Sequence, residues 1–339
     1  MKKLTIISAI TTLVIIITSI LLIVFQTPII TSLVKNNHLK IASMLYTTSK
    51  VKNKILELDY ISINTSVDKS IFNNDTIDIS KELDNEYEKV VLTKDDNEDY
   101  KRIDIEINGY KSYLVIIYDP SHVKLVSSKA FNKNNTGQQT VKEICNRYNG
   151  TVCINGGGFV DWGTGSDIPQ GCIIEDGKIT WDSKESSGLI GFNTSDKLVL
   201  VNDTCKGALE SGVRDALEFG PFLIQEGNIL VDKNTDVGGF LRASRVAIGQ
   251  RKDGIVLFLV TEGRHAKGPT VYEVAETLKQ YGAYTAGNLD GGASSSLVIE
   301  GKLINTPTNI YGQPVNNGAG RRVVSGFGLV KYKRRKKIC

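Results

Sequence analysis

The stretch "TVYEVAETLKQYGAYTAGNLDGG", residues 270 to 292, has the pattern of a helix, a short strand and a glycine-rich loop. Thr270 and Glu273 match a capping box, in which the two side chains satisfy the first free N–H groups of a helix. Apolar residues follow at helical spacing, and Gly282 is expected to end the helix. We therefore predict a capped helix that leads through a strand into a loop carrying Asp290.

An uninterrupted apolar run, "GIVLFLVTEGR" at 254 to 264, precedes this helix and suits a strand buried on both faces. Strand, helix and strand form a right-handed βαβ unit if the two strands are parallel. In adjacent parallel strands, the loops after Thr261 and Leu289 would emerge together. Open α/β sheets bind ligands at that edge, so we expect a site there.

A second segment, "TVKEICNRYNGTVCINGGG" at 140 to 158, repeats this arrangement. Thr140 and Glu143 match a second capping box, and Gly150 is expected to end the helix. The strand that follows runs into a second glycine-rich loop. We predict that the two strands are neighbours or pseudo-symmetric partners, and that their loops meet with Asn155 and Asp290 on the same side.

The loop at Asp290 has two interpretations. Asp-Gly is common in tight hairpin turns, and a hairpin is the simpler one. A hairpin, however, does not need the "ASSS" that follows at 293 to 296, and glycines beside a carboxylate suggest that backbone passes close to something. Free N–H groups and serine hydroxyls suit a phosphorylated ligand. The basic residues that could grip its phosphate oxygens are Arg245, Arg264, Arg321 and Arg322.

The N-terminus predicts the compartment. Residues 4–25 form an uncharged, mostly aliphatic run behind Lys2 and Lys3, which is long enough to span a bilayer as a helix. Lysines stay on the cytoplasmic side, so we expect a single-pass protein of the cell membrane with an extracytoplasmic domain. The run lacks a small-x-small site before Gln26, which favours an uncleaved anchor over a removed signal peptide.

Changes in composition and the positions of turn-forming residues predict how the chain is divided. We expect a transmembrane signal-anchor at 1–25, a stalk or spacer at 26–100, the main domain at 101–330 and a basic tail at 331–339. The expected fold class is α+β, with a central mixed sheet and packed helices. Within the domain, "YKSYLVIIYDPSHVKLVSS" at 110 to 128 predicts a hairpin that turns at Asp119 and Pro120.

The net charge of +4 comes from the chain ends. Eight of the 41 basic residues lie in residues 1–3 and 331–339, which leaves 33 basic against 37 acidic residues and a net charge of −4 over residues 4–330. A nucleic-acid-binding domain would be basic, so no nucleic-acid partner is expected.

Cys145, Cys153, Cys172 and Cys205 lie in the main domain and allow three disulfide pairings, while Cys339 is left over. No cysteine or histidine cluster has zinc spacing. The sequence requires no cofactor and leaves a divalent metal open.

Six segments in order resemble the phosphodiester glycosidases, the family related to the N-acetylglucosamine-1-phosphodiester alpha-N-acetylglucosaminidase and found in bacteria as exopolysaccharide-associated proteins. The resemblance covers roughly residues 101–330. In the family pattern the aspartate is followed by three glycines, and here Ala293 replaces the third; Arg322 stands where proline is common. The segments are "INGGGF" (154–159), "FGPFLI" (219–224), "SRVAIG" (244–249), "TEGR" (261–264), "NLDGGASS" (288–295) and "RRVVSGFGLV" (321–330).

The resemblance implies cleavage of the bond between a sugar anomeric carbon and a phosphodiester. It implies that Asp290 is the essential carboxylate, as base or nucleophile, and that arginines hold the phosphate. A second carboxylate would be Glu262, or else Asp161, although Glu262 is equally well explained as a strand-end residue paired with an arginine. Catalytic roles are thus expected for Asp290, Arg245 and Glu262, and substrate-binding roles for Asn155, Gly156, Gly157, Arg264, Asn288, Gly291, Gly292, Ser294, Ser295, Arg321 and Arg322.

Two functions therefore follow as expectations. The first is a membrane-anchored hydrolase that cleaves sugar-1-phosphodiester bonds, such as those of N-acetylglucosamine-1-phosphodiesters, in a cell-wall or capsule glycopolymer. The second is a noncatalytic module that holds a phosphosugar polymer at the cell surface.

Overall fold

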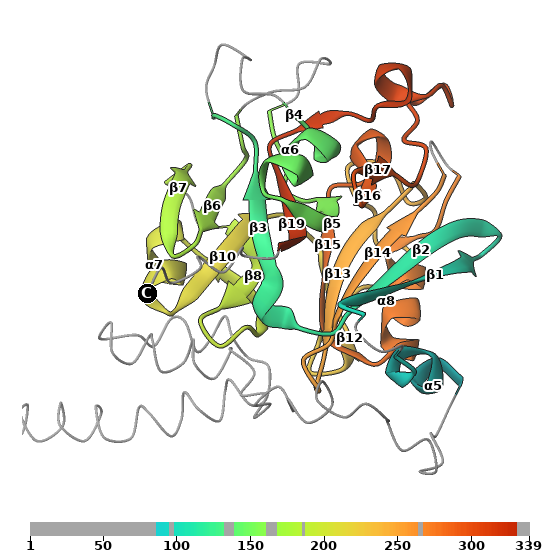
Figure 1. The fold of residues 1–339 in the computed structure, drawn as a ribbon, viewed down its shortest axis with the longest axis horizontal. Helices are drawn as coiled ribbons and strands as arrows, with labels where there is room; N and C mark the ends of the chain where they lie inside the picture. The colour runs from blue at the N-terminus through green and yellow to red at the C-terminus, as the bar shows by residue number, and fades with distance from the viewer. Residues whose placement is uncertain are drawn as a thin grey trace, which may run out of the picture. The chain divides into compact units, whose positions relative to one another are not determined.

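Strands dominate the part of the protein that the structure describes, and four α-helices pack against them there (Figure 1). The predicted α+β class is confirmed. The expected central mixed sheet is wrong, because the described strands form three larger sheets and every hydrogen-bonded pair among them is antiparallel. The computed structural model describes residues 86–94, 98–131, 139–160, 168–184, 187–263 and 267–330.

The largest sheet has seven strands in the order β1-β2-β14-β13-β15-β11-β12. Its central strands are buried along their whole length, as the apolar run at 254 to 264 predicts. The strands are β1 (Tyr100–Ile107), β2 (Tyr110–Ile117), β11 (Phe222–Gln225), β12 (Asn228–Ile229), β13 (Val246–Arg251), β14 (Val256–Thr261) and β15 (Ala283–Leu289).

Two five-stranded sheets and one short pair complete the strands. The first has the order β17-β16-β5-β19-β3, and the second has the order β7-β6-β10-β8-β9. The first contains β3 (Val123–Ser127), β5 (Gly150–Asn155), β16 (Leu297–Ile299), β17 (Lys302–Leu303) and β19 (Ser325–Val330). The second contains β6 (Cys172–Glu175), β7 (Lys178–Asp182), β8 (Ser187–Asn193), β9 (Leu198–Asp203) and β10 (Val213–Glu218), while β4 (Gln139–Thr140) pairs with β18 (Arg322–Val323).

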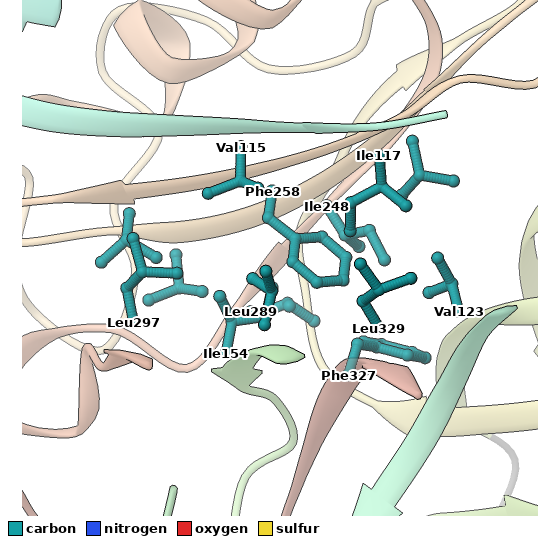
Figure 2. Close-up of a cluster of buried hydrophobic side chains, with 14 of the residues drawn as sticks. Val115, Ile117, Val123, Ile154, Ile248, Phe258, Leu289, Leu297, Phe327 and Leu329 are labelled. Carbon is teal, nitrogen blue, oxygen red and sulfur yellow. The ribbon is translucent and has the colours of Figure 1, made fainter. Parts of the chain in front are cut away.

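The main core lies between the sheets. Figure 2 shows Val115 and Phe258 of the seven-stranded sheet above Ile154 and Phe327 of the first five-stranded sheet. The second five-stranded sheet adds its own apolar side chains, including Leu217, to the same core. Fully burying each large apolar side chain contributes about 1.5–3 kcal/mol, so this core is the main stabilising feature of the domain.

Helices cover the outer faces of two sheets. Helix α8 (Val271–Gln280) packs on the seven-stranded sheet together with α5 (Glu86–Leu92), and α6 (Val141–Arg147) packs on the first five-stranded sheet. A short helix, α7 (Cys205–Glu210), follows β9. Three 3₁₀ turns, η1 (Pro120–His122), η2 (Gly292–Ser294) and η3 (Val315–Gly318), lie in the connections.

Both predicted capping boxes are present. In α6 and in α8, the threonine side chain accepts from the glutamate N–H and the glutamate carboxylate accepts from the threonine N–H. Gly282, with φ of +87°, lies directly after the C-cap of α8. Gly150 does not play this part after α6, because Asn149 takes the left-handed conformation (φ +53°) and Gly150 already begins β5. Asparagine tolerates that conformation better than most residues.

The hairpin predicted at Asp119 and Pro120 is wrong. Strand β2 pairs within the seven-stranded sheet and β3 within the first five-stranded sheet, so the chain crosses between sheets at η1. The hairpin on this side is β1-β2, whose turn is Asn108-Gly109 with positive φ at both residues. Asn-Gly is the preferred two-residue hairpin turn.

Helix α5 lies within the range expected as a stalk. Its Val91 is fully buried, the Tyr87 ring lies 5.0 Å from that of Tyr281, and Glu88 Oε1 lies 3.0 Å from Arg251 Nη2. Residues 86–92 therefore pack against the domain.

The predicted transmembrane segment, residues 4–25, lies outside the described residues, as do most of the stalk and the basic tail. In the part of the chain that the structure describes, no helix is long and apolar enough to cross a membrane.

The four domain cysteines form two disulfides, Cys145–Cys153 and Cys172–Cys205. The first ties α6 to β5, the strand that ends in Asn155. The second ties β6 to the first turn of α7.

Candidate functional site

The ends of three strands lie together at one end of the seven-stranded sheet, toward the top of Figure 1. We call this end, where the strands start or stop, the sheet edge. Val246, at the start of β13, pairs with Val260 of β14 on one side and with Leu289 of β15 on the other. Strands β14 and β15 are therefore parallel to each other, but they are not adjacent as predicted, because β13 lies between them. The two strands still end at the same edge of the sheet, as predicted. Arg245, the residue before Val246, lies between Thr261 and Asp290.

Hydrogen bonds lock these ends together. Arg245 N donates to Thr261 Oγ1 (2.7 Å), and Gly292 N donates to Ser244 O (2.9 Å). Ser244 Oγ donates in return to Gly292 O (2.9 Å). The start of β13 thus holds both loops in register.

The two glycine-rich loops meet, as predicted. We call residues 155–158 the first glycine loop and residues 290–296 the second glycine loop. Asn155 Nδ2 donates to Asp290 O (2.6 Å), Asp290 N donates to Gly156 O (2.8 Å), and Ser296 N donates to Asn155 Oδ1 (2.9 Å). The preceding strands β5 and β15 are not paired neighbours, however, because they belong to different sheets.

The second glycine loop is not a hairpin. After Asp290 the chain passes through η2 and enters β16, which belongs to the first five-stranded sheet. Gly291 touches other backbone, because a Cβ there would lie 2.5 Å from Ser244 O, and Gly292 has φ of +58°. The half-buried Asp290 is therefore held where the chain crosses between sheets.

The first glycine loop is also closely packed. A Cβ on Gly156 would lie 2.3 Å from Leu217 Cδ2, and one on Gly157 would lie 3.1 Å from Glu218 O and from Ser325 Oγ. These glycines thus let strands from two sheets approach, and their contact with a ligand stays a prediction.

Arg245 is buried, with 3% of its surface exposed. Its Nη2 donates to Phe240 O (2.6 Å) and Leu241 O (2.9 Å), and its Nε donates to Pro269 O (3.4 Å). Burial lowers the pKa of this guanidinium to about 10, and Asp236 opposes that shift. Nη1 makes no hydrogen bond with the described residues, so the guanidinium is fixed along one side and retains two N–H donors.

Glu262 is held by two donors. Its Oε1 accepts from Tyr113 OH (3.2 Å) and from Thr306 N (3.1 Å). Burial and the nearby Glu262 raise the pKa of Tyr113 to about 12. The ion pairs between described residues include none of Glu262 with an arginine, so the predicted arginine partner is not found there and Tyr113 and Thr306 are its partners instead. Its catalytic role stays a prediction.

Unsatisfied polar groups gather along the second glycine loop and the strand before it. Asn288 Nδ2 donates to Gly220 O (2.8 Å), but its buried Oδ1 has no hydrogen-bond partner among the described residues. The buried hydroxyls of Ser294, Ser295 and Ser296 also lack partners in that part of the chain. Nearly all buried polar groups in proteins are hydrogen-bonded, and exceptions often mark binding or catalysis.

The remaining predicted residues are spread around this edge. Arg321 lies over the ring of Phe159 (4.9 Å), beside the first glycine loop. Arg322 is exposed on β18, where it pairs with Thr140. Arg264 and Asp161 lie outside the described residues.

Metal ligands do not gather here. No group of three or more histidine, cysteine, aspartate or glutamate side chains that could hold a metal occurs within the described ranges.

Two parts of the edge were not predicted from the sequence. Ser244 and Thr261, which hold the strand ends, have no local pattern that distinguishes them. The segment after β17, which approaches Glu262 through Thr306, shows turn residues in the sequence but nothing that places it here.

Several known proteins are similar to this chain in sequence. The family model described as phosphodiester glycosidase matches residues 148–326. The prophage-derived uncharacterised protein YomE of Bacillus subtilis is 27% identical over 200 residues, which is 56% of this chain and 29% of that protein. The N-acetylglucosamine-1-phosphodiester alpha-N-acetylglucosaminidase of Mus musculus is 26% identical over 172 residues, 45% of this chain and 32% of that enzyme. The match thus spans about a third of the length of these relatives.

Two solved structures share the fold. The zebrafish N-acetylglucosamine-1-phosphodiester alpha-N-acetylglucosaminidase catalytic domain, auto-inhibited by its pro-peptide, superposes with a TM-score of 0.58 at 21% identity, covering 71% of this chain and 86% of that one. A hypothetical protein from Synechocystis superposes with a TM-score of 0.50 at 17% identity, covering 68% and 61%.

Proposed function

Since the chain belongs to the phosphodiester glycosidase family, we propose that it hydrolyses sugar-1-phosphodiester bonds, as in N-acetylglucosamine-1-phosphodiesters, within a cell-surface glycopolymer. The single observation that carries this proposal is the position of Asp290. Asp290 is half-buried in a loop whose backbone is fixed by Asn155 and Gly156, next along the sheet edge to Arg245.

The residues at the edge suit a phosphosugar. Arg245 keeps two unused N–H donors on Nη1, and charge-assisted hydrogen bonds to phosphate are among the strongest that proteins make. The free oxygen of Asn288 and the serine hydroxyls of the second glycine loop can bond sugar hydroxyls or phosphate oxygens.

The chemistry follows from the leaving group. A phosphomonoester leaves readily, so the bond from the anomeric carbon to the phosphate oxygen can break without the strong acid that ordinary glycosides require. Asp290 then serves as base or nucleophile, while arginines stabilise the charge that develops on the phosphate. Water supplies the hydroxyl of the released sugar.

We place the reaction outside the cytoplasm, at the membrane. The uncharged run at residues 4–25 supports an anchor, and the two disulfides are typical of an oxidising compartment.

A noncatalytic phosphosugar-binding module is the second candidate. The contacts of Glu262 favour this second candidate. The Glu262 carboxylate already accepts hydrogen bonds from Tyr113 and Thr306, so Asp290 is then the one carboxylate among the described residues that we expect to act in catalysis.

A substrate panel separates the two. The full-length protein is incubated with a GlcNAc-1-phosphodiester, an aryl N-acetylglucosaminide and a plain dialkyl phosphodiester. We expect turnover of the first substrate alone. Binding of the first without turnover identifies the module, and turnover of the plain phosphodiester identifies a different reaction.

A further inference from the structure

A turn after β17 exposes large apolar side chains. Tyr311 is 81% exposed and the neighbouring Ile310 is 44% exposed, which makes Tyr311 the most exposed large hydrophobic residue of the described chain. Adjacent exposed apolar residues on an ordered segment often mark an interaction site.

The turn orders these residues through its own hydrogen bonds. Asn309 Oδ1 accepts from Tyr311 N (2.9 Å) and from Gln313 N (3.1 Å), and Asn309 N donates to Gln313 O (2.9 Å). The backbone at Tyr311 is therefore already ordered, so a ligand that stacks on its ring pays less of the entropic cost of ordering.

Both ends of this segment reach the candidate site. We call residues 306–322 the rim segment; it follows β17 and returns through β18 above the sheet edge (Figure 1). At one end Thr306 N donates to Glu262 Oε1 (3.1 Å). At the other end a Cβ on Gly320 would lie 3.3 Å from Ser296 Oγ, and Arg321 lies over Phe159.

The composition of the rim segment differs from that of the rest of the domain. It contains no aspartate or glutamate, ends in two arginines and carries four side-chain amides, whereas residues 4–330 have a net charge of −4. An aromatic face packs against the C–H face of a pyranose ring, while amides and guanidinium groups bond hydroxyls and phosphate. This combination is complementary to an anionic sugar chain.

We propose that the rim segment binds a second sugar-phosphate unit of a polymeric substrate, with one sugar ring on Tyr311 and a phosphate at Arg322. This inference rests on the proposed function and adds to it a second binding subsite, for a unit of the polymer next to the bond that is cleaved. The sugar-phosphate unit bound at the rim segment does not contain the bond that is cleaved. The rim segment therefore contributes to the affinity for substrate and not to the chemical step.

Two substrates test the inference on the full-length protein. One is a synthetic tetramer of N-acetylglucosamine-1-phosphate units, and the other is the methyl phosphodiester of a single unit. We expect Tyr311→Ala to raise KM for the tetramer about tenfold and to leave kcat/KM for the methyl diester within about twofold, and Arg322→Gln to raise KM for the tetramer by a similar factor. Ile179→Ala, which truncates an exposed apolar residue on β7, is the matched control and should change neither.

The outcomes separate the inference from the proposed function. An unchanged KM for the tetramer in Tyr311→Ala, or equal losses on both substrates, overturns the rim subsite while wild-type turnover still supports the reaction. If the wild type cleaves neither substrate, the proposed function fails. The subsite is then judged by equilibrium binding of the tetramer, which Tyr311→Ala must weaken about tenfold for the inference to stand.

Discussion

The two glycine loops begin alike and end differently. Each follows a capped helix and a short strand, and each places an asparagine or aspartate beside glycines. In the first glycine loop both side-chain ends of Asn155 bond backbone, and Gly156 is packed against Leu217. In the second, three serine hydroxyls are buried without partners. From this difference we expect the first loop to act mainly as a scaffold, and the second to offer its polar groups to a ligand.

The strongest test of this contrast is Asp290→Asn. We expect kcat/KM on a GlcNAc-1-phosphodiester to fall by at least about 10³-fold, because the amide neither accepts a proton nor attacks carbon. The thermal midpoint should stay close to that of the wild type, since the loop is held by backbone atoms of residue 290. Glu106→Gln, an exposed carboxylate on β1, is the control for the same chemical change. Wild-type turnover in Asp290→Asn would remove this residue from the mechanism.

Asn155→Ala should show the opposite pattern. It leaves Asp290 O and Ser296 N without their partners, which we expect to lower the free energy of unfolding by about 2–4 kcal/mol. Urea unfolding measures this change, and Asn202→Ala, at an exposed asparagine on β9, should be nearly neutral. A stable Asn155→Ala variant that has lost only activity would instead make Asn155 a substrate contact.

Measuring the free energy of unfolding at several pH values tests whether the contact between Tyr113 and Glu262 stabilises the fold. Burial, and then Glu262, raise the pKa of Tyr113 to about 12. A tyrosine whose folded pKa is raised contributes stability that is complete below pH 10, the unfolded pKa, and is lost as pH rises through the folded value. Between pH 10 and pH 11 the wild type should therefore lose about 1 kcal/mol relative to Tyr113→Phe. Parallel stability curves of the two proteins would mean that Tyr113 titrates normally.

Ser295→Ala should give the smallest change. Its hydroxyl is buried without a partner, so we expect its removal to raise the free energy of unfolding by up to about 1 kcal/mol. The same variant should lower kcat/KM if the hydroxyl bonds substrate. A loss of more than about 1 kcal/mol would reveal a partner and place Ser295 with the scaffold.

Local patterns predicted the elements of this fold well. The two capping boxes, the buried strand β14 and the meeting of the two loops all follow from the spacing of a few residues. Non-local pairing could not be predicted in the same way. No residue near Pro120 indicates that β2 and β3 join different sheets, and nothing between residues 254 and 292 indicates that β13 separates β14 from β15.

The candidate site shows the same difference between residues that a local pattern predicts and residues that depend on non-local contacts. Asp290 and its glycines were predicted as site residues because an unusual run of residue types marks them. The buried position of Arg245 depends on the carbonyls of Phe240, Leu241 and Pro269, which the loop just before β13 and the turn before α8 supply. No residue pattern indicates that these carbonyls converge on the guanidinium. Glu262 owes its occupied carboxylate to Tyr113, 149 residues earlier in the chain.

The position of β19 constrains the order in which this protein can form. This strand, residues 325–330, lies between β5 and β3 and is the sole strand that pairs with β3 in the described chain. A polypeptide made from its N-terminus exposes the free edges of β3 and β5 throughout synthesis, and unpaired edges invite association with other chains. Folding of this sheet is therefore complete only when the final stretch of the described chain has been made. A truncation a few residues before β19 would remove an interior strand of the sheet and leave β3 unpaired, rather than shorten an edge strand.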